Sequence, residues 1–190
     1  TGTNMVKTFG GGLRSVNNET ENVGKYMENL ARAVLLSARG NSGVIFSQFV
    51  HGIYRSFEGK ETISFFDFID AFKAAKEDAY NSIITPTEGT ILTLIRETAD
   101  FLKETGNSYT DFKSGFEAIL TQMKASLAKT PDLLPVLKEA GVVDSGGAGL
   151  VCFIEGIYAA LCGDSIEDTP DLAEMLSEST LSSSNFGLDS

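Results

Sequence analysis

The sequence contains no tryptophan, one histidine, two cysteines and four prolines among its 190 residues, and it is short of basic side chains. Its 15 Lys and Arg face 26 Asp and Glu, which gives a net charge of −11. Proteins that bind nucleic acids or anionic membranes need a surplus of cations, so this balance argues against both. A small anionic ligand is still compatible, provided that backbone amides or metal ions hold it.

Long apolar runs are also missing. No stretch approaches the roughly 20 apolar residues that span a bilayer, and the first residues do not resemble a signal peptide. Cys152 and Cys162 lie ten residues apart in one predicted helix. About 15 Å then separates them, beyond the limit of about 7 Å for a disulfide. We therefore expect two reduced thiols that serve as small packing residues in a cytoplasmic protein.

Several common site signatures are absent as well. His51 is the only histidine and lies within a predicted helix, so neither a His-containing triad nor a His-rich metal site is supported. The sequence contains no Walker P-loop, and no G-x-G-x-x-G follows a predicted strand. The isolated run Gly10-Gly11-Gly12 is too short for a phosphate fingerprint, and we expect a mobile loop there.

Apolar residues recur at intervals of three and four, and no run alternates as a half-buried strand does. A hydrophobic content of 42% with 13 Phe is enough for one globular core. The pattern predicts seven helices in an all-α bundle or barrel. Six of their apolar faces lie within residues 27–35, 46–57, 65–75, 91–102, 112–127 and 150–161, and the remaining helix follows the fifth of these.

Local signals place two of these helix starts. Ser64, with Asp67 three residues later, forms a capping box. Thr130 followed by Pro131 predicts another start, because proline is favoured in the first helical position.

The composition changes after residue 163. The last 27 residues contain acidic side chains without Lys or Arg, and a hydroxyl-rich run covers 179–184. We therefore expect a helical domain over 1–163, then an acidic Ser-rich linker or tail over 164–190 with a short helix near 172–176.

Four predicted helix starts combine glycine with a hydroxyl or amide side chain. They are Thr1-Gly2-Thr3-Asn4, Gly40-Asn41-Ser42-Gly43, Glu88-Gly89-Thr90 and Asp144-Ser145-Gly146-Gly147. Unpaired amides at a helix start bind anions, so converging starts would form a phosphate or nucleotide site without lysine. The same residue types are ordinary helix caps, and the pattern leaves both interpretations open. Arg39 could approach a bound phosphate or be an exposed charge at a helix C-terminus.

Three segments resemble, in order, the nucleotide-binding domain that dihydroxyacetone kinases share with bacterial fatty acid kinases. They are Ala38 to Ile45 (ARGNSGVI), Glu88 to Thr93 (EGTILT) and Leu134 to Gly147 (LPVLKEAGVVDSGG). The residues of these segments are most similar to the fatty acid kinase branch, and the resemblance covers most of residues 1–163.

This resemblance implies a DhaL-like up-and-down barrel of eight helices, the first lying upstream of this chain, with ATP or ADP and two magnesium ions at one end. The implied nucleotide-binding residues are Thr1, Gly2, Thr3, Asn4, Asn41, Ser42, Gly43, Gly89, Thr90, Ile91, Asp144, Ser145 and Gly146. Family members place the aspartates that hold Mg²⁺ directly before Thr-Gly-Thr-Asn. We therefore expect no metal ligands within this chain, a start at a fragment boundary, and poor phosphoryl transfer by the isolated chain.

The resemblance also implies a function. A kinase domain would transfer the γ-phosphate of ATP to the carboxylate of a fatty acid presented by a DegV-type fatty-acid-binding protein, and downstream domains would form a homodimer. Two alternatives stay open: a dihydroxyacetone kinase-type nucleotide subunit, and a non-catalytic helical domain that binds nucleotide or a protein partner.

Overall fold

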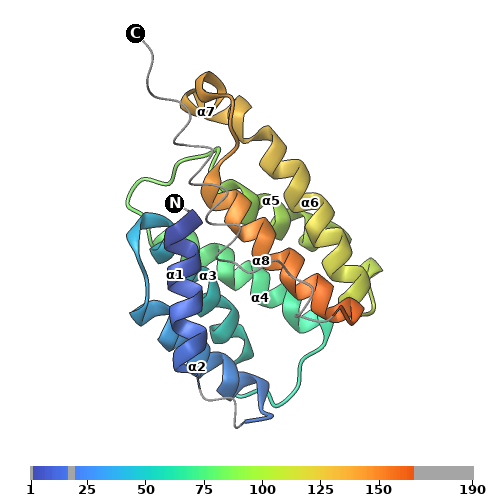
Figure 1. Cartoon of the computed structure of the whole chain (residues 1–190). Helices are drawn as coiled ribbons and strands as arrows, with labels where there is room; N and C mark the ends of the chain where they lie inside the picture. The colour runs from blue at the N-terminus through green and yellow to red at the C-terminus, as the bar shows by residue number, and fades with distance from the viewer. Residues whose placement is uncertain (1, 17–19, 165–190) are drawn as a thin grey trace.

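The computed structural model describes residues 2–16 and 20–164 (Figure 1). All regular structure within these residues is helical, which confirms the predicted all-α class. The helices are α1 (Gly2–Ser15), α2 (Val23–Leu36), α3 (Gly40–Phe57), α4 (Phe65–Asn81), α5 (Ile91–Thr105), η1 (Gly106–Ser108, a 3₁₀ turn), α6 (Phe112–Leu133), α7 (Pro135–Ala140) and α8 (Ser145–Cys162).

The seven long helices close into a ring. Helix α2 packs against α3, α3 against α4, α4 against α5, and α5 against α6. Helix α6 then packs against α8, and α8 packs against α1. Helix α1 also contacts α2 and α3, which completes the closure. The short helix α7 stands at the end of the bundle where α1 and α8 begin (Figure 1). Every long helix can thus bury one apolar stripe in a shared core.

Aromatic side chains join helices that are distant in sequence. Phe9, Phe46 and Phe153 meet edge to face with ring centroids 4.9 to 5.7 Å apart, and they connect α1, α3 and α8. Phe68 and Phe116 lie 4.8 Å apart and connect α4 with α6. Such edge-to-face and tilted pairs add to the area-dependent stabilisation of a core.

The prediction of a mobile loop at residues 10–12 was wrong, because these glycines lie inside α1. A Cβ atom on Gly12 would lie 2.5 Å from Val34 Cγ2 and 2.9 Å from Val34 Cα. Glycine therefore allows α1 to approach α2 closely, and packing outweighs the poor helix propensity of the glycine run. Helix α1 was also missing from the seven predicted helices, so the described residues contain eight α-helices instead of seven.

The prediction of a helix start at Thr130 was also wrong. Helix α6 continues through Pro131 to Leu133, and the next helix begins at Pro135. Proline removes the amide that would bond the Leu127 carbonyl, but the Thr130 hydroxyl donates to that oxygen at 2.7 Å. This substitute bond compensates for part of the cost of proline within a helix.

The capping box at Ser64 is confirmed: its hydroxyl accepts the Asp67 N–H, and the Asp67 carboxylate accepts the Ser64 N–H at 2.7 Å. Both cysteines are free, as expected, but they are exposed, so their assignment as packing residues was wrong. The linker predicted over 164–190 lies outside the described residues except for Asp164.

Helix α8 is more apolar than the sequence analysis allowed. Among the described helices it alone reaches 18 residues with a mean hydropathy of 1.5, enough in length and composition to cross a membrane. Leu150, Val151 and Ile154 are buried in the bundle core, and a core helix of this kind meets the same criteria.

Candidate functional site

The starts of α1 and α3 lie side by side. The Thr8 hydroxyl donates to the Asn4 carbonyl oxygen at 2.7 Å and accepts the Arg39 backbone N–H at 3.0 Å. Arg39 immediately precedes α3, and a Cβ atom on Gly40 would lie 2.5 Å from Asn4 Nδ2. The first two predicted turns therefore meet, except that Thr1 lies outside the described residues.

The third and fourth predicted turns meet at the end of α6. The Asp144 N–H, at the start of α8, donates to the Thr130 hydroxyl oxygen at 3.1 Å. A Cβ atom on Gly89 would lie 3.1 Å from the Thr130 carbonyl oxygen and 2.7 Å from Leu134 Cβ. Residues at the end of α6 thus hold the turn before α5 beside the start of α8.

The first two turns of α8 contact both α1 and α5, and so connect the first two predicted turns with the last two. A Cβ atom on Gly149 would lie 2.9 Å from Met5 Sδ of α1, and one on Gly147 would lie 3.1 Å from the methyl groups of Leu94 on α5. All four helix starts are consequently at one end of the bundle, where α1 and α8 begin in Figure 1. This juxtaposition is the one that a shared anion site requires.

The start of α3 differs from those of α2, α4, α5, α6 and α8. Side-chain oxygens of the preceding residue accept a first-turn amide at α2, α4, α5, α6 and α8. At α3 the preceding residue is Arg39, which provides no side-chain cap. The amides of the first α3 turn are therefore not satisfied by a cap, and the positive end of the helix dipole faces outward there.

The residues of this uncapped turn suit a bound anion. Gly40 has φ = +63°, Asn41 is exposed, and Ser42 is 8% exposed. Arg39 is exposed, and its guanidinium donates to the neighbouring Ala38 carbonyl at 3.2 Å. The cation thus lies at the start of α3, next to the uncapped amides.

Several glycines of the four turns have structural reasons that do not require a ligand. Gly40 and Gly89 adopt positive φ, which side chains disfavour. Gly43 and Gly147 face Thr8 and Leu94, where a Cβ atom would lie at 2.5 Å and 3.1 Å. Glycine in these turns is therefore weaker support for a ligand site than the convergence itself.

Side-chain exposure divides the remaining predicted residues. Thr3 and Ser145 are exposed, whereas Gly146 is buried and Ile91 is 2% exposed in the core. Thr90 is half-buried, and its hydroxyl caps α5 by accepting the N–H of the second helical residue. A ligand would reach Ile91 and Gly146 through the backbone only.

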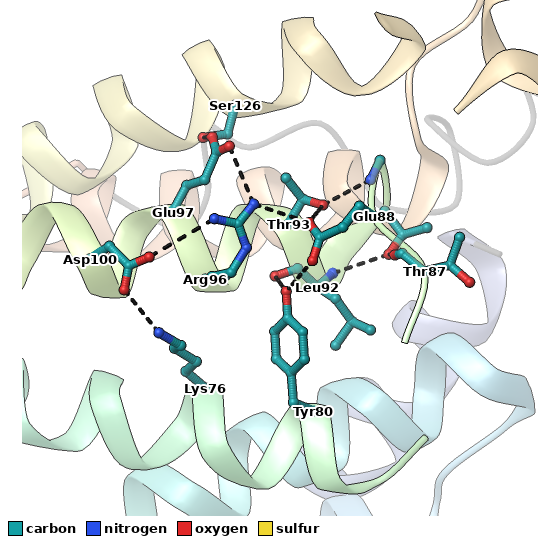
Figure 2. Close-up of polar contacts among 12 residues, drawn as sticks. Lys76, Tyr80, Thr87, Glu88, Leu92, Thr93, Arg96, Glu97, Asp100 and Ser126 are labelled. Carbon is teal, nitrogen blue, oxygen red and sulfur yellow. Dashed lines mark hydrogen bonds and ion pairs between the residues drawn. The ribbon is translucent and has the colours of Figure 1, made fainter. Parts of the chain in front are cut away.

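Glu88 is the centre of a polar cluster behind the Gly89 turn (Figure 2). Its Oε2 atom accepts the Thr93 hydroxyl at 2.6 Å and Arg96 Nη2 at 3.0 Å, and its Oε1 atom accepts the Tyr80 hydroxyl at 2.9 Å. Thr93 Oγ1 also accepts the Gly89 N–H at 2.8 Å. We call Glu88, Gly89, Thr93, Arg96 and Tyr80 the Glu88 cluster.

The Glu88 cluster fixes the ionisation of its own members. Partial burial raises the pKa of the Glu88 carboxyl, but hydrogen bonds from Thr93, Arg96 and Tyr80 outweigh it, so the pKa lies below its ordinary value. Burial and the bond to Glu88 raise the pKa of Tyr80 to about 12. At neutral pH a carboxylate therefore accepts from three protonated donors.

Reasoning from the sequence missed Thr8, Thr93 and Thr130, the buried hydroxyls that hold the four helix starts together. Thr8 bonds a residue 31 positions away, and Thr130 bonds one 14 positions away. Of the three, only Thr93 could have been predicted as a site residue, because it belongs to the Glu88 to Thr93 segment that resembles the family. A threonine inside a helix gives no local signal of such a long-range partner.

The acidic residues beside the four helix starts already accept hydrogen bonds from the protein. Asp144 Oδ2 accepts the Gly147 N–H at 2.7 Å, and Glu88 is occupied by its three donors. Within residues 2–16 and 20–164, no group of three or more His, Cys, Asp and Glu side chains is arranged to hold a metal ion. The residues that the structure describes therefore do not by themselves form a magnesium site.

His51 takes no part in the convergent helix starts. Its Nδ1 atom lies 2.8 Å from Asp78 Oδ2, and Arg55 donates to the other oxygen of Asp78 at 2.9 Å. The histidine is part of a hydrogen-bonded group between α3 and α4, consistent with the partly exposed helical position expected for it.

Comparison with known proteins adds a family. The family model described as "DAK2 domain" matches residues 1–159. Protein YloV of Bacillus subtilis is 41% identical over 181 residues, covering 93% of this chain and 33% of that protein. An uncharacterised protein of Staphylococcus saprophyticus is 44% identical over 167 residues, covering 87% of this chain and 30% of that protein. The chain thus spans about a third of the length of the curated relatives that it matches.

Proposed function

Because the chain belongs to the DAK2 domain family, a nucleotide-binding branch of the dihydroxyacetone kinase family, we propose that it binds ATP at the four convergent helix starts and transfers the γ-phosphate to a fatty acid carboxylate. A DegV-type carrier protein presents the fatty acid, and the product is an acyl phosphate. Domains beyond this chain would provide dimerisation.

One observation carries the proposal: an uncapped helix start, at Gly40, lies among three other starts at one end of the bundle. Phosphate oxygens are suitable partners for first-turn amides, because they accept hydrogen bonds and interact favourably with the helix dipole. The chain has a net charge of −11, so backbone amides provide attraction for a polyphosphate that the overall charge does not.

The proposed reaction forms one bond to phosphorus and breaks one. A carboxylate oxygen attacks the γ-phosphorus, the bond from that phosphorus to the β–γ bridging oxygen breaks, and ADP leaves. The described residues would contribute by holding the phosphates in line and by balancing charge, the two contributions that dominate phosphoryl transfer. Magnesium would neutralise triphosphate charge when bound, and its ligands are not formed by the described residues.

The direct test is an activity assay on the complete protein. With ATP, magnesium, a fatty acid and its DegV-type carrier, we expect ADP and acyl phosphate in equal amounts. Turnover with dihydroxyacetone and its binding subunit, and none with the fatty acid, would replace the acceptor in the proposal. Nucleotide binding without any transfer would favour the non-catalytic interpretation.

A matched pair of serines tests the nucleotide site. Ser42 lies in the uncapped turn, whereas Ser47 is fully buried in the same helix and donates to the Val44 carbonyl at 2.8 Å. We expect Ser42→Ala to weaken ATP binding by on the order of 1 kcal/mol, as for the loss of a hydrogen bond to a charged group. Ser47→Ala should leave ATP affinity unchanged. Equal affinities of the Ser42→Ala variant and the unsubstituted protein would contradict a phosphate site at the start of α3.

A further inference from the structure

The Glu88 cluster lies at the C-terminal end of an exposed loop, where α5 begins. Residues 84–88 are exposed, and the Ile84 side chain is fully so. At the end of this loop the Gly89 N–H donates to Thr93 Oγ1, and the Thr93 hydroxyl donates to Glu88 Oε2. Two bonds to one buried hydroxyl therefore fix the last two loop residues against the first turn of α5.

The turn is held from its other side by packing. Gly89 has φ = +82°, and the space beside its Cα atom is closed by Leu134 and by the Thr130 carbonyl oxygen. The Thr90 hydroxyl donates to the Thr87 carbonyl oxygen at 2.7 Å, which tightens the loop further. The backbone from Gly89 into α5 is therefore set before any ligand arrives.

Arg96 also balances the negative charge of Glu88 within the cluster. Its Nη2 atom lies 3.0 Å from Glu88 Oε2 and 3.6 Å from Glu97 Oε1, and its Nη1 atom lies 3.9 Å from Asp100 Oδ2. Figure 2 shows Arg96 between these carboxylates, with Lys76 bonded to Asp100. Without this cation, the Glu88 carboxylate would repel an anion bound at the neighbouring turn.

We propose that Thr93 and Arg96 are positioning residues for the nucleotide: Thr93 fixes the Gly89–Thr90–Ile91 backbone in its binding conformation, and Arg96 orients and neutralises Glu88 behind it. This inference rests on the proposed nucleotide site and adds residues that act on it without touching the ligand. Preorganised amides bind better because no ordering cost falls on the binding step.

Helix α5 offers a matched control for Thr93. Thr98 is also fully buried, but its hydroxyl has no hydrogen-bond partner among the residues that the structure describes. In the complete protein, we expect Thr93→Val to weaken ATP binding about tenfold, Thr98→Val to change it less than twofold, and Thr93→Ser to restore it. Affinity is measured by calorimetry at a temperature where circular dichroism shows each variant folded, so a loss of stability alone would not change it.

Arg96→Gln provides a second test should Thr93→Val fail to fold, since Arg96 is partly exposed. We expect ATP affinity to fall at least fivefold, with a matching rise in KM and little change in kcat. Arg55→Gln is the control, because it removes the same charge from an ion pair of similar length near the far end of α3. If both Thr93→Val and Arg96→Gln bind ATP as the unsubstituted protein does, the positioning role is refuted. If the unsubstituted protein does not bind ATP, the proposed function is refuted, and this inference with it.

Discussion

Three glycines with left-handed backbones provide a graded test of the geometry. Gly141, Gly40 and Gly89 have φ values of +67°, +63° and +82°. Among the described residues, a Cβ atom would meet nothing within 4 Å at Gly141, the flexible end of Asn4 at Gly40, and both backbone atoms and Leu134 Cβ at Gly89. Alanine at each position therefore adds the same backbone strain but a different obstruction.

The magnitudes follow from these obstructions. Left-handed alanine costs about 1 kcal/mol, which is the whole expected effect at Gly141. At Gly40 the Asn4 side chain must leave its rotamer, which brings the total to about 2 kcal/mol. At Gly89 the obstructing atoms cannot turn away, so overpacking brings the total to about 3 kcal/mol. For a domain of this size we expect melting temperatures lower by about 3, 6 and 9 °C.

The assay is thermal and urea unfolding of the three alanine variants, followed by ATP titration of those that remain folded. Gly40→Ala should also weaken ATP binding, because it displaces Asn4 at the proposed site, whereas Gly141→Ala should not. Equal destabilisation by all three substitutions would refute the claim that these contacts close the site. A Gly40→Ala variant as stable as the unsubstituted protein would refute the left-handed start of α3.

Three further predictions concern single side chains. Asp144→Ala should destabilise α8 by about 1 kcal/mol in urea unfolding, while Asp144→Asn keeps the cap on Gly147 and should cost less than about 0.3 kcal/mol; equal losses would contradict the capping role. Lys60 and the Ser64 capping bonds lower the pKa of Asp67 to about 2, so its contribution, about 1 kcal/mol after screening, is present above pH 4 and is lost as the pH falls toward 2. An acid titration in which Asp67→Asn and the unsubstituted protein lose equal stability between pH 4 and 2 would show otherwise. Burial, and to a lesser degree Glu155, raises the pKa of the Cys152 thiol, so alkylation followed by mass spectrometry should be slow there below pH 9 despite its exposure. Labelling of Cys152 at the rate of a free thiol would contradict this.

The helix pattern could be predicted wherever its causes are local. Helices α2 to α5 and α8 lie where the apolar spacing placed them, and the capping box at Ser64 was confirmed. The failures at Gly12 and Pro131 have one kind of cause. Packing against Val34 supports a glycine-rich helix, and the Thr130 hydroxyl compensates for a missing amide within α6. In both cases a contact outweighs the local propensity of the residue.

The candidate site was likewise predictable from the sequence only in part. Its hydroxyl and glycine residues were chosen from their types and their places at helix starts, which neighbours within four residues determine. Their meeting could not be established from types alone, because an ordinary cap and an anion site use the same residues. The missing cap at Arg39, which distinguishes α3 from α5 and α8, follows from residue type, because a guanidinium has no acceptor atom, but that Arg39 occupies the cap position appears only in the structure.

The sequence alone therefore determined an all-α chain, most of its helix positions and four polar helix starts, since helical periodicity and capping depend on residues within a turn or two of each other. Only the tertiary structure decided that these starts share one end of a closed ring. Bonds such as that between Thr8 and Arg39, 31 residues apart, and that between Thr130 and Asp144 bring them together. Which hydroxyls reach such distant partners depends on how whole helices pack, a property that no short stretch of sequence contains.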